Sequence, residues 1–377
     1  MGVSTIEISD RHDRLRRLME SQDLDAILVG EKYNYWYLTG HQSREFDKIM
    51  RPMLFLLPRA GAPCAIIYRQ QIPKLEKTCP GVRAYGYEDV PFEVALLQQA
   101  LDESGTSRGR LGMELGENQR LGLPYADLRQ LLADCPGLTL ADAGPELQEL
   151  RMQKSTYEID TLRTACDVSL QAWELTLKQM GPGSTELDLR RLLATELSRL
   201  GSDFDVAGHV STSTSKGGDP SSPLERGDAI WSDFGATYEG YQADVARRAV
   251  FGPPTPEHRA TRDQMASLVE ASLEAVRPGN RASDVAQACS ARLVDLGMPA
   301  LTSKKRIGHG LGLNAGEPPS LSLADNTLLV PGMVLCVEPR FFLSTGEKIH
   351  VEDVVVVSES GFDYISQGAT ELHVIDN

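Results

Sequence analysis

Two aspartates occupy a tract that otherwise reads as a buried β-hairpin. Residues 230–252 have the sequence IWSDFGATYEGYQADVARRAVFG, in which Asp233 stands between Trp231 and Phe234, and Asp244 follows Tyr241. A buried charge without a partner costs several kcal/mol or loses its ionisation. The hairpin therefore requires other groups, or bound cations, that balance these two carboxylates.

A second tract has the same layout. Residues 333–361 read as an apolar strand with one acid, Glu338, a polar turn, and another strand with a second acid, Glu352. A weak internal duplication of a helix and hairpin unit would produce such a pair of tracts. Between the tracts, the sequence RIGHGLGLNAGEPPS places His309 among glycines, which let the backbone bring an imidazole close to a site.

Four carboxylates inside apolar strands, joined by one imidazole, indicate a metal site, because divalent cations accept such ligands. A set this rich in carboxylates suits two ions that share bridging carboxylates and activate a water between them. The alternative for any single acid is a strand-end residue that faces solvent, which is common for lone acids. That alternative is much weaker for all of the residues together, namely Asp233, Asp244, His309, Glu338 and Glu352.

The motifs GDAIWSDFGATYEGYQADVAR, GHGLGL, PGMVLCVEP and IHVED resemble those of the pita-bread metallohydrolase family M24, which contains methionine aminopeptidase, aminopeptidase P, prolidase and creatinase. The N-terminal tract RLRRLMESQDLDAILVGEKYNYWYLTG is similar to the small first domain of the creatinase and prolidase branch. The resemblance implies an α/β (α+β) fold. A small N-terminal creatinase-like α/β domain would span residues 1–150, followed by a C-terminal pita-bread catalytic domain over 151–377.

The resemblance also implies the roles of the site residues. Asp233 would bind one metal, Asp244 and Glu352 would bridge both, and His309 and Glu338 would complete the other. Glu338 would also act as the catalytic general base, taking the proton from the attacking water so that a metal-bridged hydroxide is the nucleophile. The oxygen-rich shell favours two Mn²⁺ ions per subunit, and Co²⁺ or Zn²⁺ also fit.

The chain departs from the family pattern at two positions. Gly316 stands where the family signature has a second histidine, and Lys216 stands where another histidine is expected before the Gly227-Asp228 pair. Histidines at such positions hold the substrate carbonyl and stabilise the tetrahedral intermediate. The replacements leave the metal ligands intact and open the choice of substrate.

Further residues are candidates for substrate contact. His350 precedes Glu352 by two positions, so on a strand it would share the face of that ligand, and we expect it in the catalytic pocket, where many relatives carry Arg. Lys216 and His209 are candidates for substrate binding, with ordinary loop or strand residues as the alternative. Arg247 matches the family's Arg after the second aspartate; it is also a substrate-binding candidate, and its simplest role is to pair with a metal-bound acid.

These features predict a dinuclear metal-dependent hydrolase of amide or peptide bonds, a metallopeptidase of the Xaa-Pro aminopeptidase or dipeptidase type. The missing histidines keep a second hypothesis open, a creatinase-like or ectoine-hydrolase-like C–N hydrolase that acts on a small non-peptide substrate. A binding protein on an inactive pita-bread scaffold is a third hypothesis, which the complete ligand set makes weaker. The expected partner is a small peptide or small amide substrate.

Composition and charge argue against several other classes of function. The formal net charge of -15, without a Lys/Arg stripe, argues against a nucleic-acid or anionic-membrane partner. No run approaches the roughly 20 apolar residues of a membrane span, the N-terminal stretch has no apolar core of a secretory signal, and the 6 cysteines are scattered. We therefore expect a cytoplasmic enzyme, and the resemblance implies a homodimer in which the small domain of one subunit helps to close the other's active site.

Hydrophobic periodicity gives a coarse map of the elements. We expect strands at 25–30 and 110–115, and strands at 33–40, 52–63 and 64–68 around the RAGAP turn. A long helical tract over 145–183, ended by Gly-Pro-Gly, should connect the two domains. Other helices are expected over residues 11–22, 91–105, 124–137, 184–201, 255–279 and 281–297.

Overall fold

The structure is a computed structural model that describes residues 2–48, 50–88, 92–203, 207–212, 219–342 and 348–376. The chain divides into two compact units, Met1–Arg151 and Met152–Asn377. Within the described residues, every helix is too short or too polar to cross a membrane.

The N-terminal unit contains one mixed sheet with the strand order β4-β3-β2-β1-β5-β6. β1 pairs antiparallel with β2 and parallel with β5, which explains why these strands are short apolar runs buried on both faces. The strands are β1 (Ala26–Val29), β2 (Leu54–Pro58), β3 (Cys64–Tyr68), β4 (Arg83–Tyr87), β5 (Arg110–Met113) and β6 (Thr139–Asp142).

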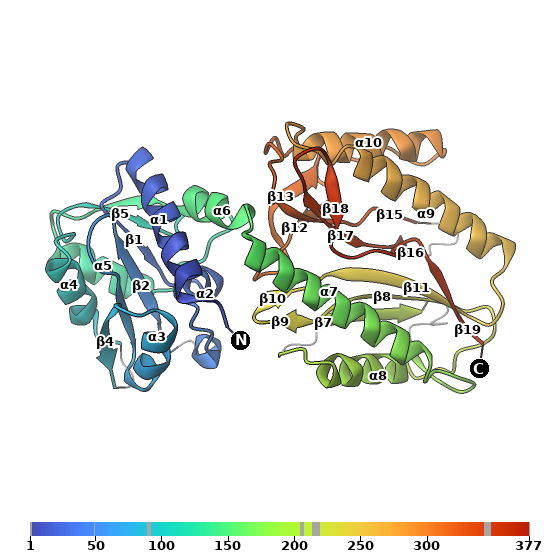
Figure 1. Cartoon of the computed structure of the whole chain (residues 1–377), viewed down its shortest axis with the longest axis horizontal. Coiled ribbons are helices and arrows are strands. Elements are labelled where there is room, and N and C mark those ends of the chain that lie inside the picture. Colours follow the sequence, from blue (N-terminus) through green and yellow to red (C-terminus); the bar gives the residue numbers. More distant parts are fainter. Residues whose placement is uncertain are drawn as a thin grey trace. The chain divides into compact units, whose positions relative to one another are not determined.

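Helices cover both faces of this sheet. α4 (Val94–Glu103) and α5 (Tyr125–Asp134) pack on one face, and α1 (Thr5–Ser21), α2 (Lys32–Thr39) and α3 (Ile72–Thr78) lie toward the other (Figure 1). Leu97 and Leu131 are fully buried between α4, α5 and the strands. The short 3₁₀ turns are Arg44–Asp47 and Arg69–Gln71.

The expectation of a strand over 33–40 is wrong, because this segment forms helix α2. The Glu31 carboxylate accepts hydrogen bonds from the backbone N–H groups of Tyr33 and Asn34, at 2.8 and 3.0 Å, and so caps the first turn. Gly40 ends the helix in the left-handed region with φ 65°. These caps override the strand preference of the aromatic residues between them.

The single long helix expected over 145–183 is two helices, α6 (Gly144–Met152) and α7 (Thr156–Leu177). Ser155 begins α7 through a capping box, in which its hydroxyl and the Glu158 carboxylate each accept a backbone N–H of the other residue. The backbone N–H of Lys154 donates to the carbonyl of Gly332 at 2.9 Å, which ties the break to the C-terminal unit.

The C-terminal unit holds two sheets, with strand orders β19-β11-β8-β7 and β13-β12-β14-β17-β18, and two short ribbons, β9 with β10 and β15 with β16. The strands of the first sheet and its ribbon are β7 (Ala207–Thr212), β8 (Ala229–Gly235), β9 (Thr237–Tyr238), β10 (Tyr241–Gln242), β11 (Val245–Phe251) and β19 (Leu372–Ile375). Those of the second are β12 (Arg306–Gly310), β13 (Glu317–Ser322), β14 (Val334–Val337), β15 (Arg340–Phe342), β16 (Lys348–His350), β17 (Asp353–Val357) and β18 (Phe362–Tyr364).

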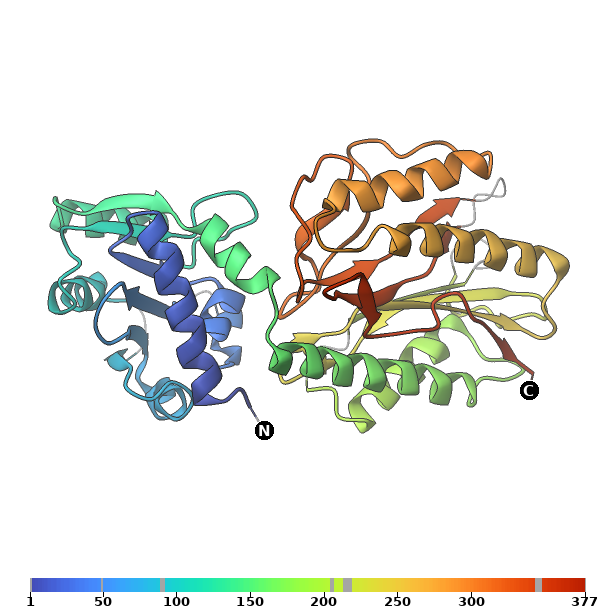
Figure 2. The same ribbon diagram turned by 45° about the horizontal axis from the view of Figure 1, so that its top comes forward.

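Two helix pairs enclose these strands. α7 and α8 (Glu186–Arg199) lie on one side, and α9 (Pro256–Glu274) and α10 (Ala282–Asp295) lie on the other, with the sheets between them in both views (Figures 1 and 2). α7 contacts β8, β9 and β10, whereas α9 and α10 contact strands of the second sheet. Each helix pair, with the strands next to it, therefore corresponds to one of the two helix and hairpin units seen in the sequence.

The candidate acids lie in the central strands or where the long hairpins are interrupted. Asp233 is in β8 and Asp244 separates β10 from β11, while Glu338 separates β14 from β15 and Glu352 separates β16 from β17. An isolated bridge between Ala246 and Glu352 connects the two halves. The fold thus brings the acids of both hairpins to one place.

Candidate metal centre

Four of the five predicted ligands fall in two overlapping groups of side chains; the fifth, Asp233, is in neither group, and its Oδ2 lies 3.8 Å from Nδ1 of His350. One ligand atom from each of Asp244, His309, Cys336 and Glu352 lies within 4.8 Å of the others, and the same holds for Glu338, His350 and Glu352. Glu352 belongs to both groups, which is the position expected for a bridging carboxylate. Five of the six residues in these groups were expected in the site from the sequence, and Cys336 was not.

His309 presents one ring nitrogen to the acids. Its Nδ1 lies 3.0 Å from the carbonyl oxygen of Gly310, and because a carbonyl only accepts, Nδ1 carries the proton. Nε2 then lies 3.7 Å from Oδ2 of Asp244 and 3.6 Å from Oε1 of Glu338. Burial lowers the pKa of His309, so its neutral, metal-binding form is favoured.

The acids repel one another in the metal-free protein. Burial, followed by the nearby charges of Asp233 and Glu338, raises the pKa of Asp244 to about 8. Burial and the charges of Asp244 and Glu338 also raise the pKa of Glu352 well above its ordinary value. A cation among these carboxylates would remove both the desolvation penalty and the repulsion.

Glu338 behaves differently from its neighbours. Burial alone would raise its pKa, but contact with His350 and the nearby His309 outweigh burial and lower it. Arg306 Nε and Arg340 Nη1 also lie 3.9 and 3.8 Å from the Glu338 carboxylate. We did not predict these two arginines; the only signal for Arg340 is its place two residues after Glu338, where a strand returns to the same face.

The donor set fits a divalent cation. Glu352 is 1% exposed, yet its Oε1 makes no hydrogen bond within the described residues. Buried polar atoms almost always have a partner, so an atom of this kind inside a carboxylate cluster indicates a ligand. Carboxylate oxygens and imidazole nitrogens are the donors that Mn²⁺, Co²⁺ and Zn²⁺ accept.

Arg247 is fully engaged by the protein itself. Its guanidinium pairs with the Asp353 carboxylate at 2.8 Å and donates to the carbonyls of Glu352 and Gln367 at 2.6 and 3.1 Å. Asp353 also accepts a hydrogen bond from Ser366. Both charges are buried, so the pair holds the backbone on either side of Glu352 in place.

Three further positions singled out in the sequence are His209, Lys216 and Gly316. The backbone of His209 lies in β7 opposite Asp233. Lys216 falls in 213–218, outside the described residues. Gly316 is exposed, and a Cβ added there would have no atom within 4 Å, so a side chain at this position would have room.

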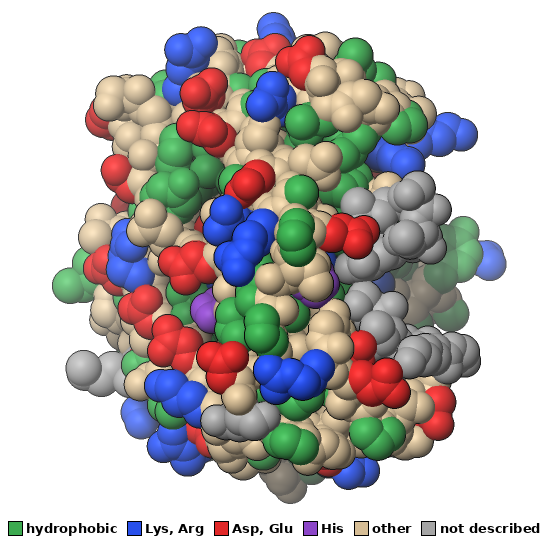
Figure 3. Space-filling view, turned by 90° about the vertical axis from the view of Figure 1, so that its right-hand side faces the viewer, with side chains coloured by type: hydrophobic (Ala, Val, Ile, Leu, Met, Phe, Trp, Pro, Cys, Tyr) green, Lys and Arg blue, Asp and Glu red, His purple; other side chains and the backbone are tan. Residues whose placement is uncertain are grey.

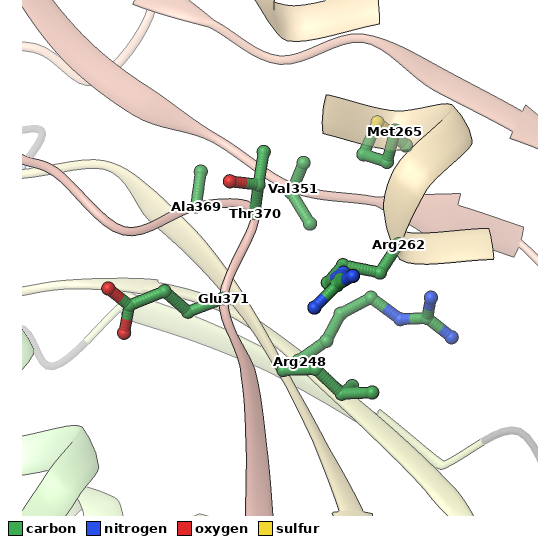
Figure 4. A pocket seen from close by; sticks show the side chains of 8 residues that line it. Arg248, Arg262, Met265, Val351, Ala369, Thr370 and Glu371 are labelled. Atoms are coloured by element: carbon green, nitrogen blue, oxygen red, sulfur yellow. The ribbon is translucent and has the colours of Figure 1, made fainter. Parts of the chain in front are cut away.

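A small pocket near the acids belongs to the other face of the strand. Val351 lines it, whereas the flanking residues His350 and Glu352 belong to the ligand groups, and alternate residues of an extended chain face opposite sides. Val351 and Met265 are also part of the apolar core. The pocket in Figure 4 is therefore distinct from the metal centre; it is lined by Arg248, Arg262, Met265, Val351, Ala369, Thr370, Glu371 and Leu372.

The face of the molecule in Figure 3 carries charges of both signs. On the face seen in Figure 3, acidic and basic side chains are interspersed, and histidine side chains are visible near its centre. On this face, the net charge of -15 is therefore not gathered into one broad acidic patch.

Together, an α/β unit with helices on both faces and a second unit that gathers carboxylates and imidazoles between two helix pairs define a metal-dependent hydrolase. Residues 160–359 match the model of metallopeptidase family M24, and residues 11–153 match that of the creatinase/prolidase N-terminal domain. The chain belongs to metallopeptidase family M24 and is a metal-dependent peptidase. The predicted family and fold class, a creatinase-like domain followed by a pita-bread domain, are confirmed.

Similar proteins span nearly the whole chain. A probable dipeptidase PepE of Mycobacterium tuberculosis is 27% identical over 361 residues, which cover 93% of this chain and 92% of that protein. An Xaa-Pro dipeptidase of Pyrococcus furiosus is 22% identical over 375 residues, covering 97% and 100%. Among solved structures, the dipeptidase PepE of Mycobacterium ulcerans has a TM-score of 0.82 and 25% identity and covers 100% of both chains. The X-Pro aminopeptidase of Thermotoga maritima has a TM-score of 0.80 at 21% identity, covers 96% of this chain and 99% of that chain, and shows the shared fold.

Proposed function

We propose that the protein is a dinuclear Xaa-Pro peptidase of the aminopeptidase or dipeptidase type. The observation that carries this proposal is the pair of donor groups that share Glu352. A buried carboxylate common to two ligand groups supports two ions held side by side. From the resemblance, we assign Asp233 to one ion, His309 and Glu338 to the other, and Asp244 and Glu352 to both. His309 and Glu338 belong to different donor groups, but Nε2 of His309 lies 3.6 Å from Oε1 of Glu338.

The bound ions and the residues of the chain would have separate roles in catalysis. Bound divalent ions supply Lewis-acid activation of water and of the scissile carbonyl. The Glu338 carboxylate accepts the proton of the attacking water, and its lowered pKa keeps it in the ionised form that this role needs. His350 contacts Glu338 at 3.1 Å and belongs to the same catalytic centre.

The proposed substrate is a small peptide with proline in the second position. The Mycobacterium tuberculosis relative is named a probable dipeptidase and the Pyrococcus furiosus relative an Xaa-Pro dipeptidase. Lys216 and His209 remain proposed substrate contacts. For Arg247, the buried contacts support positioning of Glu352 in place of direct contact with substrate.

A second candidate function rests on Gly316. The exposed glycine provides no group that could hold a peptide carbonyl at the position where the family signature has a histidine. This supports, as the alternative, a creatinase-like or ectoine-hydrolase-like C–N hydrolase that acts on a small non-peptide substrate.

A substrate panel on the Mn²⁺-loaded protein tests the proposal. Xaa-Pro dipeptides and longer Xaa-Pro peptides are compared with creatine-like and ectoine-like amides, and released proline and amine are measured. Release of proline supports the peptidase. Turnover of a small amide, with no proline from any peptide, would replace it by the alternative.

Three further properties belong to the proposal. Mn²⁺ is the metal favoured by a carboxylate-rich shell, with Co²⁺ and Zn²⁺ as alternatives. All 6 cysteines are free thiols, which supports a reducing, cytoplasmic location. A homodimer, in which the N-terminal unit of one subunit closes the active site of the other, follows from the resemblance to the two-domain branch.

A further inference from the structure

We propose that His350 is a sixth metal ligand, which binds one ion of the centre through Nε2 together with Glu338 and Glu352. The inference rests on the proposed metal centre and deepens it. It gives His350 a defined role as a donor to a cation, beyond its general place in the catalytic pocket.

The imidazole ring of His350 lies beside carboxylates of the proposed metal centre. His350 is the last residue of β16 and is 0% exposed. Its Nε2 lies 3.1 Å from Oε2 of Glu338, and its Nδ1 lies 3.8 Å from Oδ2 of Asp233. One ligand atom each of His350, Glu338 and Glu352 lies within 4.8 Å of the others, so the three side chains form one group of candidate metal donors.

The ring nitrogens of His350 have no hydrogen-bond partner among the described residues. Glu338 is nevertheless close enough to accept a hydrogen bond. A fully buried polar atom left without a partner is unfavourable. The Nε2 of His350 and the Oε2 of Glu338 lie 3.1 Å apart, close enough for both atoms to face a common cation.

Packing fixes the ring in this place. The indole of Trp231 meets the imidazole edge-on with ring centroids 5.8 Å apart. The adjacent residues Ile349 and Val351 are 0% and 2% exposed and belong to the apolar core, so the backbone on both sides of His350 is held. Pre-set donors bind a cation with less loss of conformational entropy.

The alternative is that His350 carries a proton and replaces an ion. An imidazolium between Asp233 and Glu338 would balance both carboxylates without metal, and the centre would then hold a single cation. The observed geometry favours the ligand, because a charged imidazole between two carboxylates would donate a hydrogen bond to each.

A second imidazole changes the metal preference. With His309 and His350 both binding, the centre has two nitrogen donors, and imidazole favours Co²⁺ and Zn²⁺ relative to Mn²⁺. The wild-type protein should therefore bind Co²⁺ and Zn²⁺ more tightly than a variant in which His350 is replaced by a carboxylate.

The test compares wild type, His350→Gln and the matched control His373→Gln. His373 lies in β19 against Trp173, with ring centroids 6.2 Å apart, and it is absent from both ligand groups. Each protein is stripped with a chelator and titrated with Co²⁺, and the bound ions and the exchangeable imidazole N–H signals shifted by Co²⁺ in proton NMR are counted. We expect two such signals and two ions in wild type and in the control. In His350→Gln one signal is lost and one ion binds at least about 10-fold more weakly, the lower end of the loss seen for weaker perturbations of metal sites.

Unchanged ion affinities and two shifted signals in His350→Gln would overturn the inference. So would a wild type in which Co²⁺ shifts only one imidazole N–H signal, because His350 would then not bind an ion. If His350→Gln does not fold, His350→Asp keeps the test open: we expect it to bind both ions and to lose preference for Co²⁺ over Mn²⁺, and an unchanged preference would refute the ligand. A wild type that binds two ions but releases no proline would contradict only the proposed peptidase activity. The number of shifted imidazole N–H signals would still show whether His350 is a metal ligand.

Discussion

His309 and Asp244 meet across the two sheets of the C-terminal unit, with Nε2 of the imidazole 3.7 Å from Oδ2 of the carboxylate. His309 lies in β12 and Asp244 just before β11, in hairpin systems that the chain builds separately. The bridge between Ala246 and Glu352 joins these systems next to the same place. Each hairpin system alone carries acids whose charges are not compensated. The cation site forms only where the two systems meet.

Replacing the proposed general base should remove turnover. Glu338→Gln keeps the size of the side chain but cannot accept a proton, so kcat should fall by about 10²- to 10⁴-fold. Steady-state hydrolysis of an Xaa-Pro dipeptide measures the loss. Glu359→Gln, an exposed acid after β17, is the control and should retain wild-type kcat. Wild-type kcat in Glu338→Gln would remove this residue from the mechanism.

The free energy of unfolding of the metal-free protein should fall as the pH rises, because its buried acids resist ionisation. The pKa of Asp244 is about 8 in the folded state against an ordinary 3.8, so between these values the unfolded chain ionises while the folded chain keeps its proton. The group therefore lowers the free energy of unfolding progressively from about pH 4 to about pH 8. Asp244→Asn lacks this loss. Urea unfolding after chelation should show the variant gaining stability over wild type across that range, and a constant difference would contradict the predicted repulsion.

The buried pair of Arg247 and Asp353 should matter for stability. Arg247→Met leaves the Asp353 carboxylate buried and unpaired, which typically costs about 3–5 kcal/mol. Arg262→Met removes a guanidinium whose side chain is 43% exposed, and exposed pairs contribute only about 0–1 kcal/mol. Urea denaturation of both variants gives the comparison. Equal effects would mean that the Arg247 pair does not hold the segment around Glu352.

Restoring the missing histidine should favour peptides. In Gly316→His the new side chain has room, so stability should change by no more than about 0.5 kcal/mol. One added carbonyl donor of this type is worth up to about 10²-fold in kcat. The ratio of kcat/KM for Xaa-Pro peptide over small amide should therefore rise. Gly361→His, at another open position, should leave the ratio unchanged. A ratio that stays the same in both variants would show that Gly316 does not set substrate choice.

The clustering of Asp244, His309, Glu338 and Glu352 was predictable, because these residue types are unusual where they occur. Acids inside apolar strands need partners, and this physical demand is visible without any coordinates. Helix α2 was not predictable in the same way, because its caps depend on Glu31 and Gly40, while the aromatic residues between them prefer strands. Arg306 and Arg340 reach Glu338 only through tertiary packing, and Cys336 reads as an ordinary apolar strand residue until β12 and β14 pair.

The most direct test of the account is the metal content of wild type and Asp244→Ala, measured together with Xaa-Pro hydrolysis after loading with Mn²⁺. Asp244 is proposed to bridge the two ions, so its removal should abolish turnover and reduce the bound metal, while wild type should hold two ions per chain and release proline. Wild-type activity in Asp244→Ala, or fewer than one ion per chain in wild type, would contradict the dinuclear centre.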